Sequence, residues 1–251
     1  MTENKCEISI KPRFDTEENQ GKTKLGNSGK IENKSRLKGA EKYFYCVVPC
    51  GKEKNFGRIG MNDNEVYTLP HKDIAAVVSD SSLKEYELTE EYATRHEEVI
   101  RHVMEEHAVV PVEFGTLIKN EKILTRLMDK TYDPVKACLK LVDNTVELGV
   151  KAVLNKKSVF DGSRRKECVS DILRSLKTKA KQVAIGDLFS DRLILNAAFL
   201  VNKDNIDAFS DEVIKLQEKY STLKFLYSGP WAPHNFVYIK IGAKGVEIIK
   251  K

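Results

Sequence analysis

The amino-acid sequence predicts an α+β protein built from two α/β-sandwich domains that follow a disordered N-terminal tail. Three observations support this fold class. The chain of 251 residues exceeds the length of a typical single domain. After residue 42, β-rich runs alternate with amphipathic helical stretches. A composition of 41% hydrophobic and 31% charged residues is ordinary for a chain that buries a core.

The tail is expected over residues 1–42. This segment is polar, dotted with glycine and almost free of aromatic side chains. Such a segment cannot bury enough apolar surface to offset the entropy lost on ordering. We therefore expect it to be disordered, and we expect its deletion to leave the remainder folded.

The first domain is expected over residues 43–130. It begins with the β-rich run "YFYCVV", and two further strands are joined by a short turn that carries Pro70. Thr89 can cap a helix whose apolar residues recur at helical spacing. The expected elements are strands at 43–48, 65–69 and 74–79, a helix from 89 to 107, an extended segment at 109–118 and a short helix at 120–130.

The second domain is expected over residues 131–251 and opens with a helical connector at 131–144. Apolar residues alternate in "TVELGVKAVL", which is typical of a half-buried strand. Strands that alternate with helices on one side of a sheet indicate a ferredoxin-like α+β sandwich. The expected order, β-α-β-α-β-β, differs from the ideal β-α-β-β-α-β order of that fold. The expected elements are strands at 145–154, 192–201, 223–228 and 235–241 and helices at 165–183 and 205–220.

The charge distribution argues against a nucleic-acid partner. The net charge is +5, but residues 1–42 hold ten Lys or Arg against seven Asp or Glu, so the remaining residues carry only +2. The one dense basic run, "SRRKE" at 163–167, lies at an expected helix start, where a solvated helix face explains it. We therefore expect no nucleic-acid binding.

Catalytic and metal-binding signatures are not found in the sequence. His96, His102 and His107 share one expected helix at intervals of six and five residues, whereas zinc helices usually space histidines by four. Five cysteines without a C-x-x-C pair fit reduced thiols. The sequence contains neither a Gly-rich phosphate loop nor a G-x-S-x-G elbow. We expect no catalytic residues, no metal and no other cofactor.

Hydropathy gives no sign of a membrane segment. No apolar run approaches the ~20 residues that cross a bilayer. The first residues, "MTENKCEISIKPRF", lack the apolar core of a signal peptide. We expect a cytoplasmic protein without a membrane partner.

One short segment, "SGPWAPHNFVYIKI" at 228–241, contains the single tryptophan of the chain. Gly229 permits unusual backbone dihedrals, Pro230 fixes φ, and Pro233 favours an extended residue before it. Trp231 is therefore expected on a stiff corner. A stiff corner that carries a large ring either pins a core or presents a contact.

In sequence, the ordered blocks of the chain resemble the GvpL/GvpF family of gas vesicle proteins. The resemblance covers residues 43–251, and P-V-x-F-G-T at 111–116 and G-P-W at 229–231 are its most specific motifs. Where the family usually has G-P-W-P-P-Y, this chain has Ala232 and His234. The matching blocks are "YFYCVV", "DIAAVVSDSSLKEYE", "RHEEVIRHVMEEHAVVPVEFGTLI", "VELGVKAVL", "AAFLV" and "SGPWAPHNFV".

The resemblance implies a non-enzymatic accessory protein of gas vesicle formation, located at the gas vesicle. Members are understood to associate with the small hydrophobic shell protein of the vesicle wall and with other accessory proteins. A shell subunit with a water-repelling face would aggregate unless it is covered, and a stiff aromatic corner is a suitable contact. The candidate partner-binding residues are Trp231, Pro230, Pro233, His234, Phe236, Gly115 and Thr116.

Each candidate also has a purely structural interpretation. Trp231 and Phe236 could fill the core of the second domain, and this interpretation is favoured because a lone tryptophan is usually highly buried. Gly115 and Thr116 could mark a tight turn near the domain junction. Arg95 and Glu97 are expected to be solvated helix residues.

Two other functions compete with the accessory role. A ferredoxin-like regulatory module would bind a small molecule, but no convergent polar residues are recognisable by spacing. An RNA-binding module would stack bases on sheet aromatics, and Tyr43 and Tyr45 lie on one strand face. No basic and aromatic run typical of RNA-binding strands accompanies them.

Overall fold

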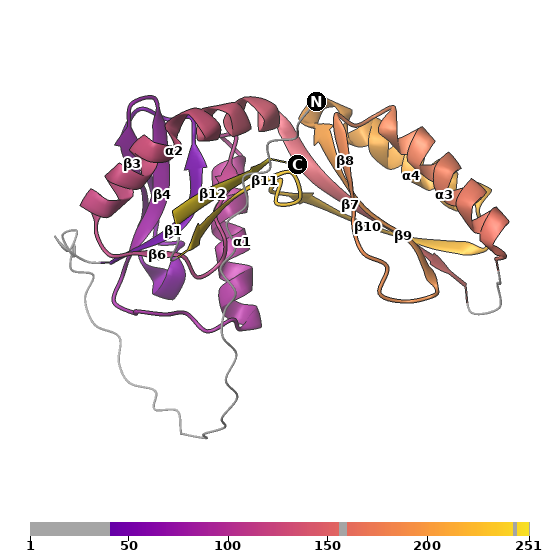
Figure 1. The fold of residues 1–251 in the computed structure, drawn as a ribbon, viewed down its shortest axis with the longest axis horizontal. Helices are drawn as coiled ribbons and strands as arrows, with labels where there is room; N and C mark the ends of the chain where they lie inside the picture. Colours follow the sequence, from indigo (N-terminus) through magenta and orange to yellow (C-terminus); the bar gives the residue numbers. More distant parts are fainter. Residues whose placement is uncertain (1–40, 156–159, 243–244, 251) are drawn as a thin grey trace, which may run out of the picture.

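The computed structural model describes residues 41–155, 160–242 and 245–250. Within these residues the fold is mixed α and β with antiparallel sheets, as the sequence predicts. The predicted tail lies almost wholly outside the described residues. Figure 1 shows one sheet on each side of the molecule, with the last two strands running between them toward the first sheet.

The first sheet has the order β2-β3-β4-β1-β5, and β6 also pairs with β1. Residues of β1 face opposite sides of the sheet, and a β-bulge between Phe44 and Cys46 shifts the alternation by one residue. Tyr43 and Tyr45 pack in a core with α1, whereas Phe44 and Val47 pack in a second core with α2. A helix therefore covers each face. The elements are β1 (Glu41–Val48), β2 (Asn55–Gly57), β3 (Val66–His71), β4 (Ile74–Ser81), α1 (Glu90–Met104), β5 (Val110–Pro111), β6 (Leu117–Ile118) and α2 (Glu121–Val142).

The predicted short helix and the predicted connector are one continuous helix, α2. Pro134 lies in its middle rather than in a first turn, so that prediction was wrong. Pro134 is exposed. Buried residues recur at helical spacing on both sides of it, and this packing stabilises the helix despite the missing donor. They are Leu124, Leu127, Met128, Thr131, Val135, Cys138, Leu139 and Val142.

The second sheet has four antiparallel strands in the order β10-β7-β9-β8. Two helices cover one of its faces, and Figure 1 shows them above the sheet. The helix predicted to reach residue 183 ends at Lys177, so its predicted end was wrong. A strand that was not predicted, β8, begins at Gln182, and the element order becomes β-α-β-β-α-β. The elements are β7 (Thr145–Leu154), α3 (Gly162–Lys177), β8 (Gln182–Ile185), β9 (Leu193–Asn202), α4 (Ile206–Lys219) and β10 (Leu223–Trp231).

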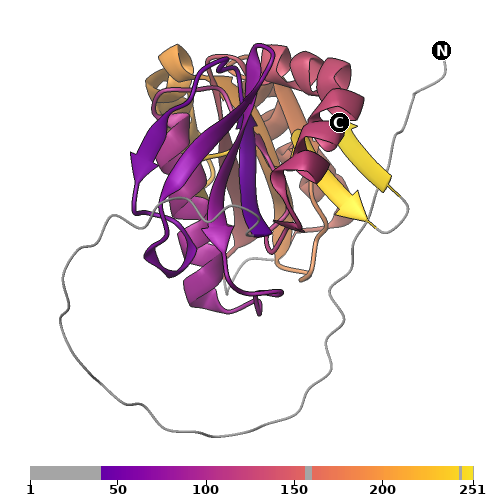
Figure 2. The same ribbon diagram turned by 90° about the vertical axis from the view of Figure 1, so that its left-hand side faces the viewer.

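The last predicted strand does not join the second sheet. It forms a hairpin of β11 (Val237–Gly242) with β12 (Gly245–Lys250). Val237 and Ile239 are buried in the core beneath α2, and Ile239 bridges Val112 in parallel. Figure 2 shows the hairpin beside α2. Burial of two β-branched side chains against α2 thus sends the end of the chain back to the first sheet.

No helix in the described part of the chain combines the length and the apolar character needed to cross a membrane.

The first strand, β1, begins at Glu41, two residues earlier than predicted, and this brings Lys42 into the first sheet. The side chain is buried, with Nζ 2.5 Å from Asp80 Oδ1 and 2.9 Å from the Tyr67 hydroxyl. Glu121 of α2 lies 3.2 Å away. Burial alone lowers the pKa of the ammonium, but the bonds with Asp80 and Tyr67 outweigh burial and hold the pKa above its ordinary value.

Lys42→Ala should destabilise the fold, because it takes the buried ammonium away from Asp80 and Tyr67. We expect a loss of about 2 to 3 kcal/mol in unfolding free energy, measured by urea denaturation at pH 7. Lys52→Ala removes an exposed lysine and should change stability by less than about 0.5 kcal/mol. Equal stability of the two variants would contradict the role of Lys42.

Candidate partner-binding site

The corner at residues 229–236 carries the chain from β10 of the second sheet to β11 beside the first. Gly229 has a φ of 118°, and the peptide bond to Pro230 is cis. A Cβ atom at Gly229 would lie 2.8 Å from the Glu147 carbonyl oxygen, so a side chain cannot be placed there without a shift. The predicted stiff corner is therefore packed directly against β7.

Trp231 and Phe236 lie in opposite environments. Phe236 is 1% exposed and packs against Ala198 and Leu200 of β9, so its predicted core role is confirmed. Trp231 is 43% exposed, so the favoured prediction of a buried tryptophan was wrong. Trp231 ends β10, an edge strand, whereas Ala232 turns inward and is buried in its place.

A cavity of about 440 Å³ lies between this corner and α1. Trp231 borders it, so an exposed aromatic ring, a helix surface and charged groups adjoin one hollow. Such a combination suits an apolar side chain of a partner with polar neighbours. The lining residues are Ala93, Thr94, Glu97, Glu98, Arg101, Pro230, Trp231 and Ala232.

A side-chain contact ties the corner to α1. His234 Nε2 lies 3.0 Å from Glu97 Oε1. Burial by itself raises the pKa of Glu97, but the hydrogen bond and charge of His234 bring the pKa below its ordinary value. The Glu97 side chain, predicted to be solvated, is 40% exposed but also meets His234. Sequence spacing along α1 gives no sign of this partner 137 positions away.

A second pair ties the corner to β7. The Asn235 backbone N–H and side-chain amide donate to the two carboxylate oxygens of Glu147 over 2.8 and 2.6 Å. Burial raises the pKa of Glu147, and the bonds from Asn235 only partly oppose this. Sequence analysis did not single out Glu147. The sequence signal that could have identified it is a charged residue within the alternating strand at 145–154.

Gly115 and Thr116 form a turn between β5 and β6, and they do not line the cavity at Trp231. Gly115 has a φ of 78°. Thr116 Oγ1 donates to the Glu113 carbonyl over 2.7 Å, and the Phe44 N–H donates to the Thr116 carbonyl over 3.0 Å. The predicted tight turn is confirmed. It joins the corner only indirectly, since the Glu113 N–H donates to the Ile239 carbonyl over 3.2 Å.

A buried chain of hydrogen bonds links this turn to α1. The Gly115 N–H donates to the Tyr43 hydroxyl over 3.0 Å, and that oxygen lies 3.0 Å from His96 Nδ1. His96 Nε2 lies 3.2 Å from the Val112 carbonyl. Because a carbonyl only accepts, Nε2 carries the hydrogen and Nδ1 accepts from Tyr43. Burial lowers the pKa of His96 to about 4, so the ring is neutral at pH 7.

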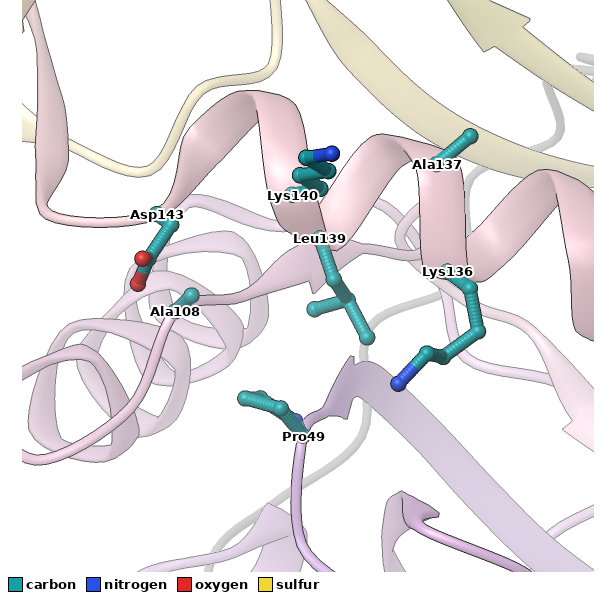
Figure 3. A pocket seen from close by; sticks show the side chains of 7 residues that line it. All are labelled: Pro49, Ala108, Lys136, Ala137, Leu139, Lys140 and Asp143. Atoms are coloured by element: carbon teal, nitrogen blue, oxygen red, sulfur yellow. The ribbon is translucent and has the colours of Figure 1, made fainter.

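A cavity of about 490 Å³ lies elsewhere, beneath α2, and none of the predicted site residues lines it. Figure 3 shows Lys136 and Leu139 extending from α2 toward Pro49. Lys136 Nζ is held 2.5 Å from Asp73 Oδ2. The other lining residues are Ala108, Ala137, Lys140 and Asp143.

The aromatic residues considered for RNA binding are not available for stacking. Tyr43 and Tyr45 are both fully buried, and Tyr45 donates or accepts a hydrogen bond with Ser79 at 2.9 Å. Bases could not reach either ring without unfolding the first sheet. In the part of the chain that the structure describes, no three His, Cys, Asp or Glu side chains are grouped as metal ligands.

The fold is that of solved gas vesicle proteins. The chain superimposes on the crystal structure of the gas vesicle protein GvpF from Anabaena sp. PCC7120 with a TM-score of 0.69, over 78% of this chain and 97% of that chain at 19% identity. The gas vesicle protein GvpF from Microcystis aeruginosa gives the same TM-score of 0.69 over 78% and 98% at 18% identity. At these identities the likeness concerns the fold alone.

Sequence similarity then places the protein more narrowly. Residues 41–162 and 160–238 match the gas vesicle synthesis protein GvpL/GvpF family. The chain is 36% identical to gas vesicle protein F of Haloferax mediterranei over 71% of this chain and 84% of that protein. It is 35% identical to gas vesicle protein F1 of Halobacterium salinarum over 72% and 84%. The chain belongs to the GvpL/GvpF family, as its sequence motifs indicate.

The buried His96 should make the stability of the fold depend on pH. Its pKa is about 4 in the folded chain against 6.5 ordinarily, so the unfolded chain binds the proton more readily. The stabilisation is complete above about pH 6.5 and is lost as the pH falls toward 4. Between pH 7.5 and 4.5 this residue should remove about 2.5 kcal/mol of unfolding free energy.

His96→Gln keeps a hydrogen-bonding side chain but cannot titrate, and it therefore isolates this effect from the carboxylates nearby. Urea denaturation of both proteins at the two pH values measures it. The wild type should lose more stability than the variant by roughly the stated amount. An equal loss in both would show that His96 is not the titrating group.

Proposed function

We propose that this protein is a non-enzymatic accessory protein of gas vesicle formation, which binds the hydrophobic shell protein of the vesicle wall and other accessory proteins at the gas vesicle. The observation that carries the proposal is the exposed Trp231 on a rigid corner beside the cavity of α1, in a chain of the GvpL/GvpF family. Exposed aromatic side chains on rigid supports are typical centres of protein interfaces.

The contacts around the corner favour this role because they fix Trp231 before any partner arrives. Gly229 lies against β7, His234 pairs with Glu97 of α1, and Phe236 is buried on β9. A group held in place by three such contacts loses little conformational entropy when it binds. An apolar shell subunit would bury part of its water-repelling surface against this preformed contact, and the hydrophobic effect favours that burial.

We also propose that the second sheet and its two helices form a ferredoxin-like unit. The element order β7-α3-β8-β9-α4-β10 and the strand order β10-β7-β9-β8 support this. We place the start of this unit after α2, near residue 143, rather than at the predicted division of 130 and 131, because α2 is continuous across that point and packs on the first sheet. The β11–β12 hairpin then counts with the first unit, because its buried residues pack beneath α2.

Capture of the shell protein tests the function. The gas vesicle shell protein is co-expressed with the full chain, and complexes are recovered by an affinity tag. We expect the wild type to capture it and Trp231→Ala to bind about 30-fold more weakly, as is usual for loss of a central tryptophan. Ile214→Ala is the matched control, because Ile214 is also an exposed apolar side chain but lies on α4.

A thermal melt of each variant shows whether folding is retained. No capture by the wild type would contradict the proposed function itself. Equal capture by wild type and a folded Trp231→Ala would leave the function standing but remove the corner from the binding site.

A further inference from the structure

One face of the second sheet is covered only at its end near the corner, where Ala198 and Leu200 pack against Phe236 and Leu141 of α2; no described helix covers the remainder. On β7, the alternate residues Val146 to Leu154 are buried beneath α3 and α4, so Gly149, Lys151 and Val153 face the other side. On β10, Phe225 packs with the helices, so Leu226 and Ser228 face away from them. We call this surface the open face, and its principal residues are Lys151, Val153, Phe189, Lys224, Leu226 and Ser228.

Large apolar side chains are exposed at the open face. Leu226 of the edge strand β10 is 44% exposed and lies opposite Lys151 in the pairing with β7. Phe189, in the connection between β8 and β9, is 74% exposed, and Lys151 Nζ lies 5.4 Å from its ring centroid. Figure 1 shows this connection hanging below the sheet, away from the two helices. Two exposed apolar side chains thus flank one lysine.

The exposed charged residues among the principal residues of the open face, Lys151 and Lys224, are both basic. Lys151 and Lys224 are exposed, and among the described residues neither has a carboxylate within 4.0 Å. They stand on adjacent strands in diagonal positions, since Lys151 pairs with Leu226 and Lys224 with Val153. Diagonal neighbours in a sheet lie roughly 7 to 8 Å apart. Glu147 on the same side is already bonded to Asn235.

The open face continues to the Trp231 corner. After Ser228 the strand is irregular, and Trp231 pairs with Glu147 on the same side as Ser228 pairs with Gly149. From Lys224 to Trp231 the strand spans roughly 20 Å. Between these ends the open face carries only the small residues Gly149 and Ser228. They lie close together, since a Cβ atom on Gly149 would lie 2.7 Å from Ser228 Oγ.

We propose that the open face binds an amphipathic helix of a partner, with an apolar stripe on Leu226, Phe189 and Trp231 and acidic side chains beside Lys151 and Lys224. This inference rests on the proposed function and specifies the partner segment. A helix about 10 Å wide covers two strands, and a length of roughly 20 Å corresponds to about 14 residues. The unpaired lysines select an acidic helix over a basic one.

The probe is a fluorescein-labelled synthetic peptide of 16 residues with leucine along one helical face and glutamate beside it. Its twin has lysine at every glutamate position. Fluorescence anisotropy with the full-length chain should show the glutamate peptide binding at least tenfold more tightly than its twin, and more weakly at high salt. Equal binding of the two peptides, or binding of neither, would overturn the proposal.

Charge reversal locates the contact. The double variant Lys151→Glu with Lys224→Glu should weaken binding of the glutamate peptide at least tenfold. Lys166→Glu, on α3 in the opposite layer, should leave binding unchanged. Leu226→Ala should weaken both peptides alike. Unchanged binding in the double variant, with a normal thermal melt, would place the helix elsewhere and overturn the proposal.

Capture of the shell protein separates this inference from the proposed function. Reduced capture by the double variant supports both. Full capture by the double variant, with no preference for the glutamate peptide, overturns the open-face proposal and leaves the function standing. Peptide binding at the open face without capture of the shell protein supports the open-face proposal and contradicts the proposed function. A dimer of the chain alone that the double variant dissociates would assign the face to a second copy and overturn the helix assignment.

Discussion

The buried hydrogen-bond chain through Tyr43 and His96 holds α1 against the first sheet, and the junction of the two sheets depends on where α1 lies. It satisfies the Gly115 N–H and the Val112 carbonyl in an apolar interior, where each polar group left unbonded would cost about 1 to 3 kcal/mol. Because His96 faces inward, its neighbour Glu97 is placed to meet the corner. The same helix supplies one wall of the cavity that Trp231 borders.

The corner divides its apolar residues between structure and surface. Phe236 and Ala232 are buried and hold the crossing from β10 to β11, which leaves Trp231 at the surface without loss of rigidity. The contact of His234 with Glu97 and the packing of Gly229 and Phe236 hold the corner in place although Trp231 itself is exposed. This arrangement suits the proposed contact better than a flexible loop would, because the entropy cost of ordering the corner has already been met during folding.

The second sheet also divides its apolar residues between a buried core and an exposed surface. Its helix-covered face supplies the core, whereas its other face exposes Leu226 and Phe189 among lysines. Exposed apolar groups usually favour aggregation, and charged side chains placed among them oppose it. The open face and the corner are continuous along β10, so one edge strand joins both proposed contacts.

Local pattern in the sequence determined the strands near residues 43–48 and 145–154, the capped helix at Thr89, the Gly115 turn and the family, because periodicity, capping and glycine conformation depend on neighbouring residues. Tertiary structure alone decided the rest. Pro134 remains helical because packing on both sides outweighs one missing donor, and Lys42 is buried because distant acceptors meet it. The pairing of Glu97 with His234 and the exposure of Trp231 depend on how two sheets meet, and no local spacing encodes contacts between residues more than a hundred positions apart.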